Sequence, residues 1–96
     1  MNFEWDPDKD AWNYVKHGIR FETAAMVFDD PYHVSQLDRV VDGEERWRTM
    51  GLIGGLVIVI VVHTYREQNG EETVRIISAR KVTKRESKDY EERNYQ

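Results

Sequence analysis

The sequence has no cysteine, and in 96 residues it has only two prolines and six glycines. Without cysteine, the chain has no disulfide scaffold, no thiolate metal site and no cysteine nucleophile. The same lack fits a reducing compartment, so we expect a cytoplasmic protein.

Long hydrophobic runs are missing as well. The longest covers residues 56–62, and with Leu52-Ile53-Gly54-Gly55 added it still falls short of the ~20 apolar residues that a membrane-spanning helix needs. The acidic N-terminus, MNFEWDPDKD, lacks the apolar centre of a secretory signal. We therefore expect no membrane contact and no cleaved leader.

The signatures of several enzyme classes are also absent. The sequence has no glycine-rich phosphate loop and no serine nucleophile elbow, so nucleotide hydrolysis and acyl transfer have no support. Its three histidines lack the spacings H-E-x-x-H and H-x-H, and we expect no metal ion and no cofactor. The aromatic residues do not form the pattern of an RNA-stacking surface.

The charge of the chain is unevenly distributed. With 40% hydrophobic and 33% charged residues, the composition is typical of one globular domain over residues 1–96. Residues 73–90 hold six basic residues against two acids, a net charge of +4, whereas the whole chain carries −4. An anion-binding surface needs clustered cations, and the planar guanidinium of arginine suits a phosphodiester.

Two helices are predicted in the first third of the chain. Asp6-Pro7 is typical of a helix start and Gly18 of a helix end. Between them, apolar residues recur at helical spacing at Ala11, Tyr14 and Val15. A second, short helix is predicted by the same kind of spacing at Phe21, Ala24, Ala25 and Phe28, and it ends at Asp29-Asp30-Pro31.

After Pro31 the pattern changes to strands. They are indicated weakly over residues 32–41 and clearly over residues 46–53, 56–66 and 73–82, with Gly54-Gly55 and Asn69-Gly70 as tight hairpin turns. Thr83-Lys84-Arg85-Glu86 fits a helix capping box. The predicted fold class is α+β, with two N-terminal helices packed on an antiparallel β-meander and a C-terminal helix.

Two cations of the basic stretch occupy positions that local physics disfavours. Lys84 and Arg85 fall in the first turn of the C-terminal helix, where the helix dipole destabilises a cation by up to ~1 kcal/mol. A phosphate bound in front of this turn would explain them. The alternative is a solvated helix face on which Glu86 and Asp89 pair with the basic residues.

Four other residues are candidates for chemistry at a phosphate. His63 ends the apolar strand and could be an acid or base at a sheet edge, or a half-exposed structural histidine. Arg46 and Arg48 share a strand face by alternation, and either bind an anion or pair with neighbouring glutamates. Tyr90 follows Glu86 by one helical turn, so its hydroxyl either reaches a phosphate or 2′-OH or packs in the core.

Short motifs follow one another along nearly the whole chain: Phe3-Glu4-Trp5-Asp6-Pro7, Lys16-His17-Gly18-Ile19, Phe21-Glu22 with Ala24-Ala25, Phe28-Asp29-Asp30-Pro31, Glu45-Arg46, His63-Thr64 and Arg75-Ile76-Ile77-Ser78-Ala79-Arg80. In this order and spacing they resemble the BrnT toxin family. Arg80, Glu86 and Tyr90 fall in the family's A-R-x-A-x-x-x-E-x-x-x-Y pattern, in which Val82 here replaces the second alanine.

The resemblance implies a RelE-like fold and the toxin half of a bacterial type II toxin–antitoxin system. Such a toxin is a ribonuclease that cleaves RNA and thereby inhibits translation. The implied partner is a BrnA-like ribbon-helix-helix antitoxin, and the toxin reaches operator DNA only through that antitoxin. The resemblance does not say which residues are catalytic.

Chemistry has to assign the roles. Metal-independent RNA cleavage needs a base for the 2′-OH, cations for the pentavalent phosphorane and an acid for the leaving 5′-oxygen. We expect Arg80 and Arg46 to stabilise the phosphorane. The general base is His63 or Glu86, and the general acid is Tyr90 or His63. The flanking phosphates are assigned to Lys84, Arg85 and Arg66.

One step of this assignment depends on strand geometry. Strict alternation places Arg75 and Arg80 on opposite faces of their strand, unless a bulge intervenes. Two other functions remain open: a non-catalytic protein that binds the antitoxin as a corepressor, and a plain RNA-binding module. The acidic remainder of the chain is poor support for the module, because sequence-independent binding usually needs a broadly positive surface.

Overall fold

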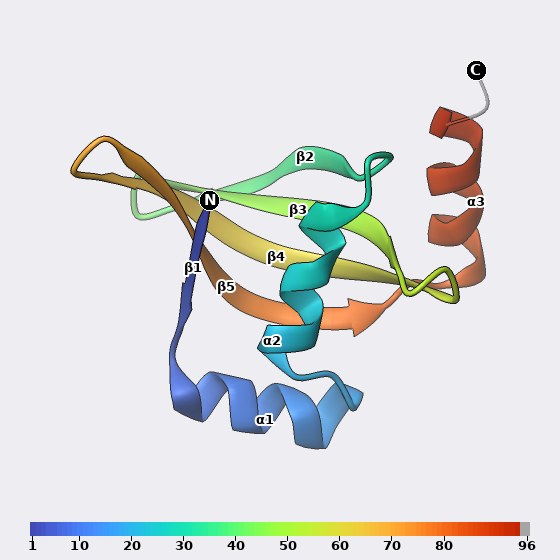
Figure 1. The fold of residues 1–96 in the computed structure, drawn as a ribbon, viewed down its shortest axis with the longest axis horizontal. Helices are drawn as coiled ribbons and strands as arrows, with labels where there is room; N and C mark the ends of the chain where they lie inside the picture. Colours follow the sequence, from blue (N-terminus) through green and yellow to red (C-terminus); the bar gives the residue numbers. More distant parts are fainter. Residues whose placement is uncertain (95–96) are drawn as a thin grey trace.

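The computed structural model describes residues 1–94, which form a five-stranded sheet with helices against it (Figure 1). Tyr95 and Gln96, the end of the predicted domain, lie outside the described residues. The elements in chain order are β1 (Asn2–Trp5), α1 (Pro7–His17), α2 (Phe21–Ala24), the 3-10 helix η1 (Ala25–Asp29), β2 (Val34–Val41), β3 (Glu44–Ile53), β4 (Val57–Gln68), β5 (Glu71–Lys81) and α3 (Lys84–Asn94).

The sheet is mixed, with strand order β1-β5-β4-β3-β2. Strands β2 to β5 form an antiparallel meander, whereas β1 pairs in parallel with β5, with Phe3 beside Val74. The α+β class is confirmed, but the predicted place of the first two helices is wrong, because they connect β1 to β2 instead of opening the chain. A strand of four residues is too short to show an alternating pattern, so the sequence did not reveal β1.

The predicted ends of α1 are confirmed. The side chain of Asp6 accepts a hydrogen bond from the backbone N–H of Asp8 at 2.8 Å, Pro7 is the first helical residue, and Gly18 adopts a left-handed φ of 72°. The second predicted helix is present as α2 followed by η1, which ends at Asp29.

The apolar residues of α1 do not face the sheet. Val15 is 83% exposed and Trp12 is 74% exposed, whereas Asn13 is buried. The Asn13 side chain donates to the carbonyl of Ala79 and accepts from its N–H, so this amide holds α1 against the outer edge of β5. A periodic pattern alone did not show that a polar residue anchors this helix.

The predicted hairpin turns are confirmed by positive φ values at Gly54, Gly55, Asn69 and Gly70. A third turn, Asp42-Gly43, joins β2 to β3 with φ values of 51° and 79°. Asp-Gly is a strong hairpin signal. The weakly predicted strand over residues 32–41 is present as β2, which lies at the edge of the sheet.

The two faces of the sheet are covered to different extents. On one face, Phe21, Ala24 and Val27 pack on the odd-numbered residues Val59 and Val61 of β4. On the other face, Tyr90 of α3 packs on Met50 and Ile60. Figure 1 shows α2 crossing the sheet and α3 standing beyond the end where β5 finishes. No helix within residues 1–94 is long and apolar enough to cross a membrane.

Gly51 of β3 lies directly beneath η1. A Cβ atom added there would come within 2.7 Å of both the side chain and the backbone carbonyl oxygen of Val27. Because a backbone atom cannot rotate away, we expect Gly51→Ala to lower the free energy of unfolding by about 1–3 kcal/mol. Chemical denaturation measures this, and an unchanged midpoint would mean that η1 does not pack this closely on β3.

Candidate nucleic-acid interface

A β-bulge in β5 decides which arginines share a face of the sheet. Ser78 pairs with Val62, but Ile76 pairs with His63, so Ile77 is an extra residue in β5. Arg80 pairs with Ile60 and Arg75 with Thr64, and these partners on β4 point to the same face. The bulge therefore places Arg75 and Arg80 together, on the face that α3 covers only at one end.

Arginines from neighbouring elements join them there. Arg48 of β3 pairs with Val62, and Arg46 is the next residue of β3 that points the same way. Gln36 of β2 pairs with Arg48. When the oxygen and nitrogen of the Gln36 amide are exchanged, the oxygen accepts hydrogen bonds from the guanidinium of Arg93 on α3. We call this surface the arginine face; its members are Arg46, Arg48, Arg66, Arg75, Arg80 and Arg93.

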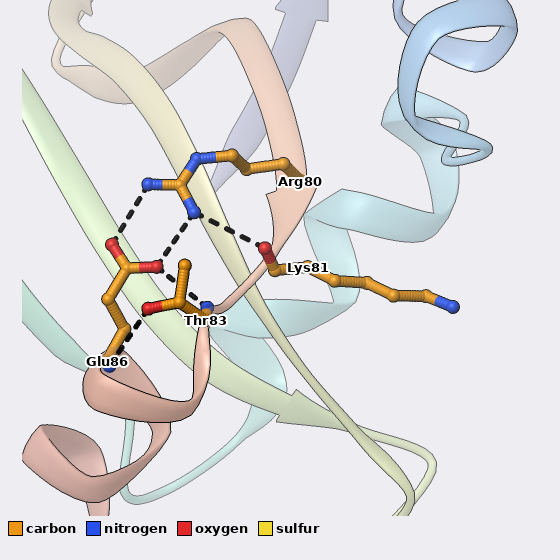
Figure 2. A network of polar contacts seen from close by, with 4 residues as sticks. All are labelled: Arg80, Lys81, Thr83 and Glu86. Atoms are coloured by element: carbon orange, nitrogen blue, oxygen red, sulfur yellow. Dashed lines mark hydrogen bonds and ion pairs between the residues drawn. The ribbon is translucent and has the colours of Figure 1, made fainter.

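Arg80 is held in place by Glu86 (Figure 2). Its Nη1 donates to Glu86 Oε1 at 2.8 Å and its Nη2 donates to Oε2 at 2.9 Å. Glu86 Oε1 also accepts from the N–H of Thr83 at 2.9 Å, and Thr83 Oγ1 accepts from the N–H of Glu86 at 3.2 Å. The predicted capping box is confirmed, and its carboxylate joins the end of β5 to the start of α3.

This pairing sets the protonation state of Glu86. The hydrogen bonds from Arg80 outweigh the effect of burial and lower the pKa of Glu86 from 4.5 to about 2. The same bonds raise the pKa of Arg80. A general base works best with a pKa near the working pH, so Glu86 is suited to positioning Arg80 rather than to removing a proton.

Arg80 retains hydrogen-bonding capacity for an anion. A guanidinium has five N–H donors, of which two serve Glu86 and one serves the carbonyl of Lys81 at 3.3 Å. The two remaining N–H groups are available to a phosphate oxygen. The side chain of Lys81 points away from this cluster (Figure 2).

Arg48 stands closer to Arg80 than Arg46 does. Arg48 pairs with Val62 of β4 and Arg80 pairs with Ile60, and these two partners lie about 7 Å apart along β4. Arg46 lies two residues from Arg48 on β3, in the direction away from Arg80. Within residues 1–94, no carboxylate forms an ion pair with Arg46 or Arg48. Geometry thus favours Arg48 as the partner of Arg80, although the sequence assigned that role to Arg46.

The expected position of His63 at a sheet edge is wrong. His63 is fully buried on the opposite face, where its ring lies against Phe28 and Tyr65 and its Nε2 shares a 2.7 Å hydrogen bond with Thr49. Burial lowers its pKa from 6.5 to about 4. The sheet therefore separates His63 from Arg80, and the structure does not bring them together.

The side chain of Tyr90, a residue of α3, is buried between this helix and the sheet. Its hydroxyl donates to Asp30, whose carboxylate also accepts from the N–H groups of Leu52 and Tyr32. Burial opposes ionisation of Asp30, but these hydrogen bonds prevail and its pKa is lowered. The Tyr90 hydroxyl thus fixes α3 to the loop before β2.

The remaining predicted residues are Arg66, which is a member of the arginine face, and Lys84 and Arg85 in the first turn of α3. Arg85 borders a shallow depression on α3 that Glu86 also lines, whereas Lys84 is simply exposed in the first turn. Arg66 lies at the other end of the face, beyond Thr64 on β4. Among residues 1–94, no group of three histidine, aspartate or glutamate side chains is arranged to hold a metal ion.

A comparison with known protein families shows to which family the chain belongs. A model described as "Ribonuclease toxin, BrnT, of type II toxin-antitoxin system" matches residues 5–86. The chain belongs to the BrnT family. The crystal structure of the Brucella abortus ribonuclease toxin BrnT has a similar fold, with a TM-score of 0.61 and 22% identity over 88% of this chain and 99% of that one. No curated protein sequence matches the chain.

The family match covers most of the arginine face. Residues 5–86 include Arg46, Arg48, Arg66, Arg75 and Arg80, whereas Arg93 lies beyond the match. The resemblance drawn from short motifs is therefore confirmed at the level of the BrnT family.

Proposed function

We propose that the chain is a metal-independent endoribonuclease that binds RNA across the arginine face. The observation that carries this proposal is the bulge at Ile77, because it places both Arg75 and Arg80 of β5 on the face that also holds arginines of β3 and β4. Family membership supports the reaction class. Cleavage of cytoplasmic RNA would inhibit translation, as the RelE-like resemblance implies.

The proposed reaction is an in-line displacement at phosphorus. The 2′-oxygen bonds to phosphorus, the bond to the 5′-oxygen breaks, and the products are a 2′,3′-cyclic phosphate and a 5′-hydroxyl. Arg80 and Arg48 stabilise the charge that develops on the phosphorane, while Glu86 keeps Arg80 in position. Guanidinium groups suit this task, because they stay charged and bind oxygens in pairs.

Proton transfer in this scheme uses water. His33 and His63 lie against Phe28 on the other face of the sheet, the carboxylate of Glu86 is a weak base, and the hydroxyl of Tyr90 donates to Asp30. Solvent hydroxide then takes the proton of the 2′-OH, and a water molecule protonates the leaving 5′-oxygen and regenerates hydroxide. His63 and Tyr90 are left out of this proposal because of where they lie.

The proposed partner is a BrnA-like ribbon-helix-helix antitoxin. Such a protein would neutralise the toxin by covering the arginine face with acidic side chains, and it would carry the complex to operator DNA. A type II family toxin pairs with an antitoxin in general. The identity of that antitoxin and its place of contact belong to the proposal.

The test is cleavage of a purified, end-labelled oligoribonucleotide in excess chelator. We expect products that end in a 2′,3′-cyclic phosphate, and no cleavage of an oligonucleotide in which every 2′-OH is replaced by hydrogen. Binding without product would instead favour a non-catalytic corepressor or RNA-binding protein. Cleavage that appears only after a divalent metal is added would contradict the metal-independent mechanism.

A further inference from the structure

The arginine face has a second centre of positive charge, about 13 Å from Arg80 along β4. Thr64 lies at this centre, four residues from Ile60, and pairs with Arg75 on β5. On β3, which flanks β4 on the side away from β5, Arg46 lies opposite Thr64. On β4 itself, Arg66 lies two residues after Thr64. One phosphate cannot contact both Arg80 and this second centre.

The second centre holds more hydrogen-bond donors than acceptors. Thr64 is 1% exposed, and its hydroxyl has no hydrogen-bond partner within residues 1–94. The Nε of Arg46 is also buried without a partner in that part of the chain. A buried donor left unpaired costs about 1–3 kcal/mol, so such groups call for a ligand or another compensating role.

Two carboxylates lie nearby, and neither saturates these donors; the first, Glu44 of β3, has its Oε2 3.9 Å from an Nη2 of Arg66. Glu4 of β1 pairs in register with Arg75, and its Oε1 lies 3.7 Å from an Nη1 of both Arg75 and Arg66. These distances are too long for hydrogen bonds, and Glu4 Oε1 is itself buried without a hydrogen-bond partner within residues 1–94. A single oxygen between two guanidinium groups marks the place where an anion with several acceptor oxygens would fit better.

We propose that Arg46, Arg66 and Arg75, the three arginines around Thr64, form a second phosphate-binding subsite. This subsite holds a backbone phosphate of the RNA other than the one that is cleaved. The inference rests on the proposed function, since it takes RNA as the ligand. An RNA strand would then run along β4, with the scissile phosphate at Arg80 and a flanking phosphate at Arg75. Phosphate suits this subsite because it offers oxygens to several guanidinium groups at once.

The experiment measures binding of a fluorescent oligodeoxynucleotide, which lacks the 2′-OH and is not cleaved. We expect Arg75→Gln to weaken binding about 5–10-fold and to reduce the slope of log affinity against log salt by about 0.7. Arg20→Gln, an equal loss of charge beside α1, should change affinity less than 2-fold. Arg66→Gln provides a second test, should Arg75→Gln unfold.

Two further variants probe the centre itself. Glu4→Gln removes one competing charge and should tighten binding about 3-fold, more than Glu22→Gln, the same change at an exposed residue of α2. Thr64→Val removes only the unpaired hydroxyl, so it should leave the melting temperature unchanged or raised while weakening binding about 3-fold. A purely structural threonine would not affect binding.

Cleavage kinetics separate this subsite from the proposed function. In an active enzyme, Arg75→Gln should raise KM while kcat stays near its normal value, because a flanking phosphate is held equally in ground and transition states. If the wild type cleaves no RNA, the proposed function fails, yet the binding comparison still decides the subsite. Equal affinity and salt slope in Arg75→Gln, Arg66→Gln and Arg20→Gln would overturn it.

Discussion

Arg80→Ala should reduce the rate constant for RNA cleavage about 10²–10³-fold, the usual effect of removing one preorganised donor from a charged transition state. The reason is that Arg80 is fixed by both oxygens of Glu86 and still has two N–H groups for the phosphorane. Single-turnover cleavage of a labelled oligoribonucleotide measures the loss, and circular dichroism shows whether the fold is kept.

Glu86→Gln provides the matched comparison for this result. The amide keeps the shape of the side chain and one acceptor oxygen, but it removes the charge that holds the guanidinium. If Glu86 only positions Arg80, cleavage should fall less than in Arg80→Ala, and the pH dependence of kcat should keep its shape. A folded Arg80→Ala variant that cleaves at the wild-type rate would remove Arg80 from the site.

Acidification should destabilise the protein strongly between pH 6.5 and pH 4, through His63. The unfolded chain binds a proton on this imidazole below about pH 6.5, whereas in the folded protein burial lowers the pKa to about 4. Protons therefore favour unfolding in this window, and the stability that is present above pH 6.5 is lost as the pH falls. The expected loss is on the order of 3 kcal/mol.

Chemical denaturation at a series of pH values measures this effect, and His63→Gln should abolish most of the slope. Glu86 does not contribute to the slope above about pH 4.5, because folding lowers its pKa from 4.5 to about 2 and its stabilisation is lost only as the pH falls from 4.5 towards 2. Direct titration of the imidazole by NMR in the wild type provides an independent check. A His63 signal that titrates near pH 6.5 would contradict the buried position.

The features of the fold that depend on a few adjacent residues were predictable. Asp6, Gly18 and the pair Thr83 and Glu86 act through hydrogen bonds within one helical turn, so sequence alone locates the ends of helices. The paired turn residues Asn69-Gly70 likewise need only their own backbone angles.

The features that depend on distant contacts were not predictable. The bulge at Ile77 inserts one residue and changes the face of every side chain beyond it, so an alternation count from Arg75 places Arg80 wrongly. In the same strand, Asn13 of α1 binds the backbone of Ala79 across 66 positions. His63 illustrates the consequence, because its place behind the sheet follows from strand register.

The residues of the proposed site were therefore only partly visible in the sequence. The basic stretch pointed to Arg80 and its surroundings, since the charge excess is visible in the sequence, and their role in cleavage stays a prediction. Arg48 was visible only as one of two arginines on a strand face, and strand register favours it over Arg46 as the partner of Arg80. Arg75 was not assigned a role, because strict alternation placed it on the other face from Arg80.

The most direct test of the arginine face as the cleavage surface uses Arg48, which has no carboxylate partner among the described residues and belongs to no predicted helix cap. The measurement is the single-turnover rate constant for cleavage of a labelled oligoribonucleotide in excess chelator, for the wild type, Arg48→Gln and Arg20→Gln. We expect Arg48→Gln to cleave at least ~10-fold more slowly than the wild type. Arg20→Gln should cleave at the wild-type rate. Equal rates for all three proteins would contradict the account.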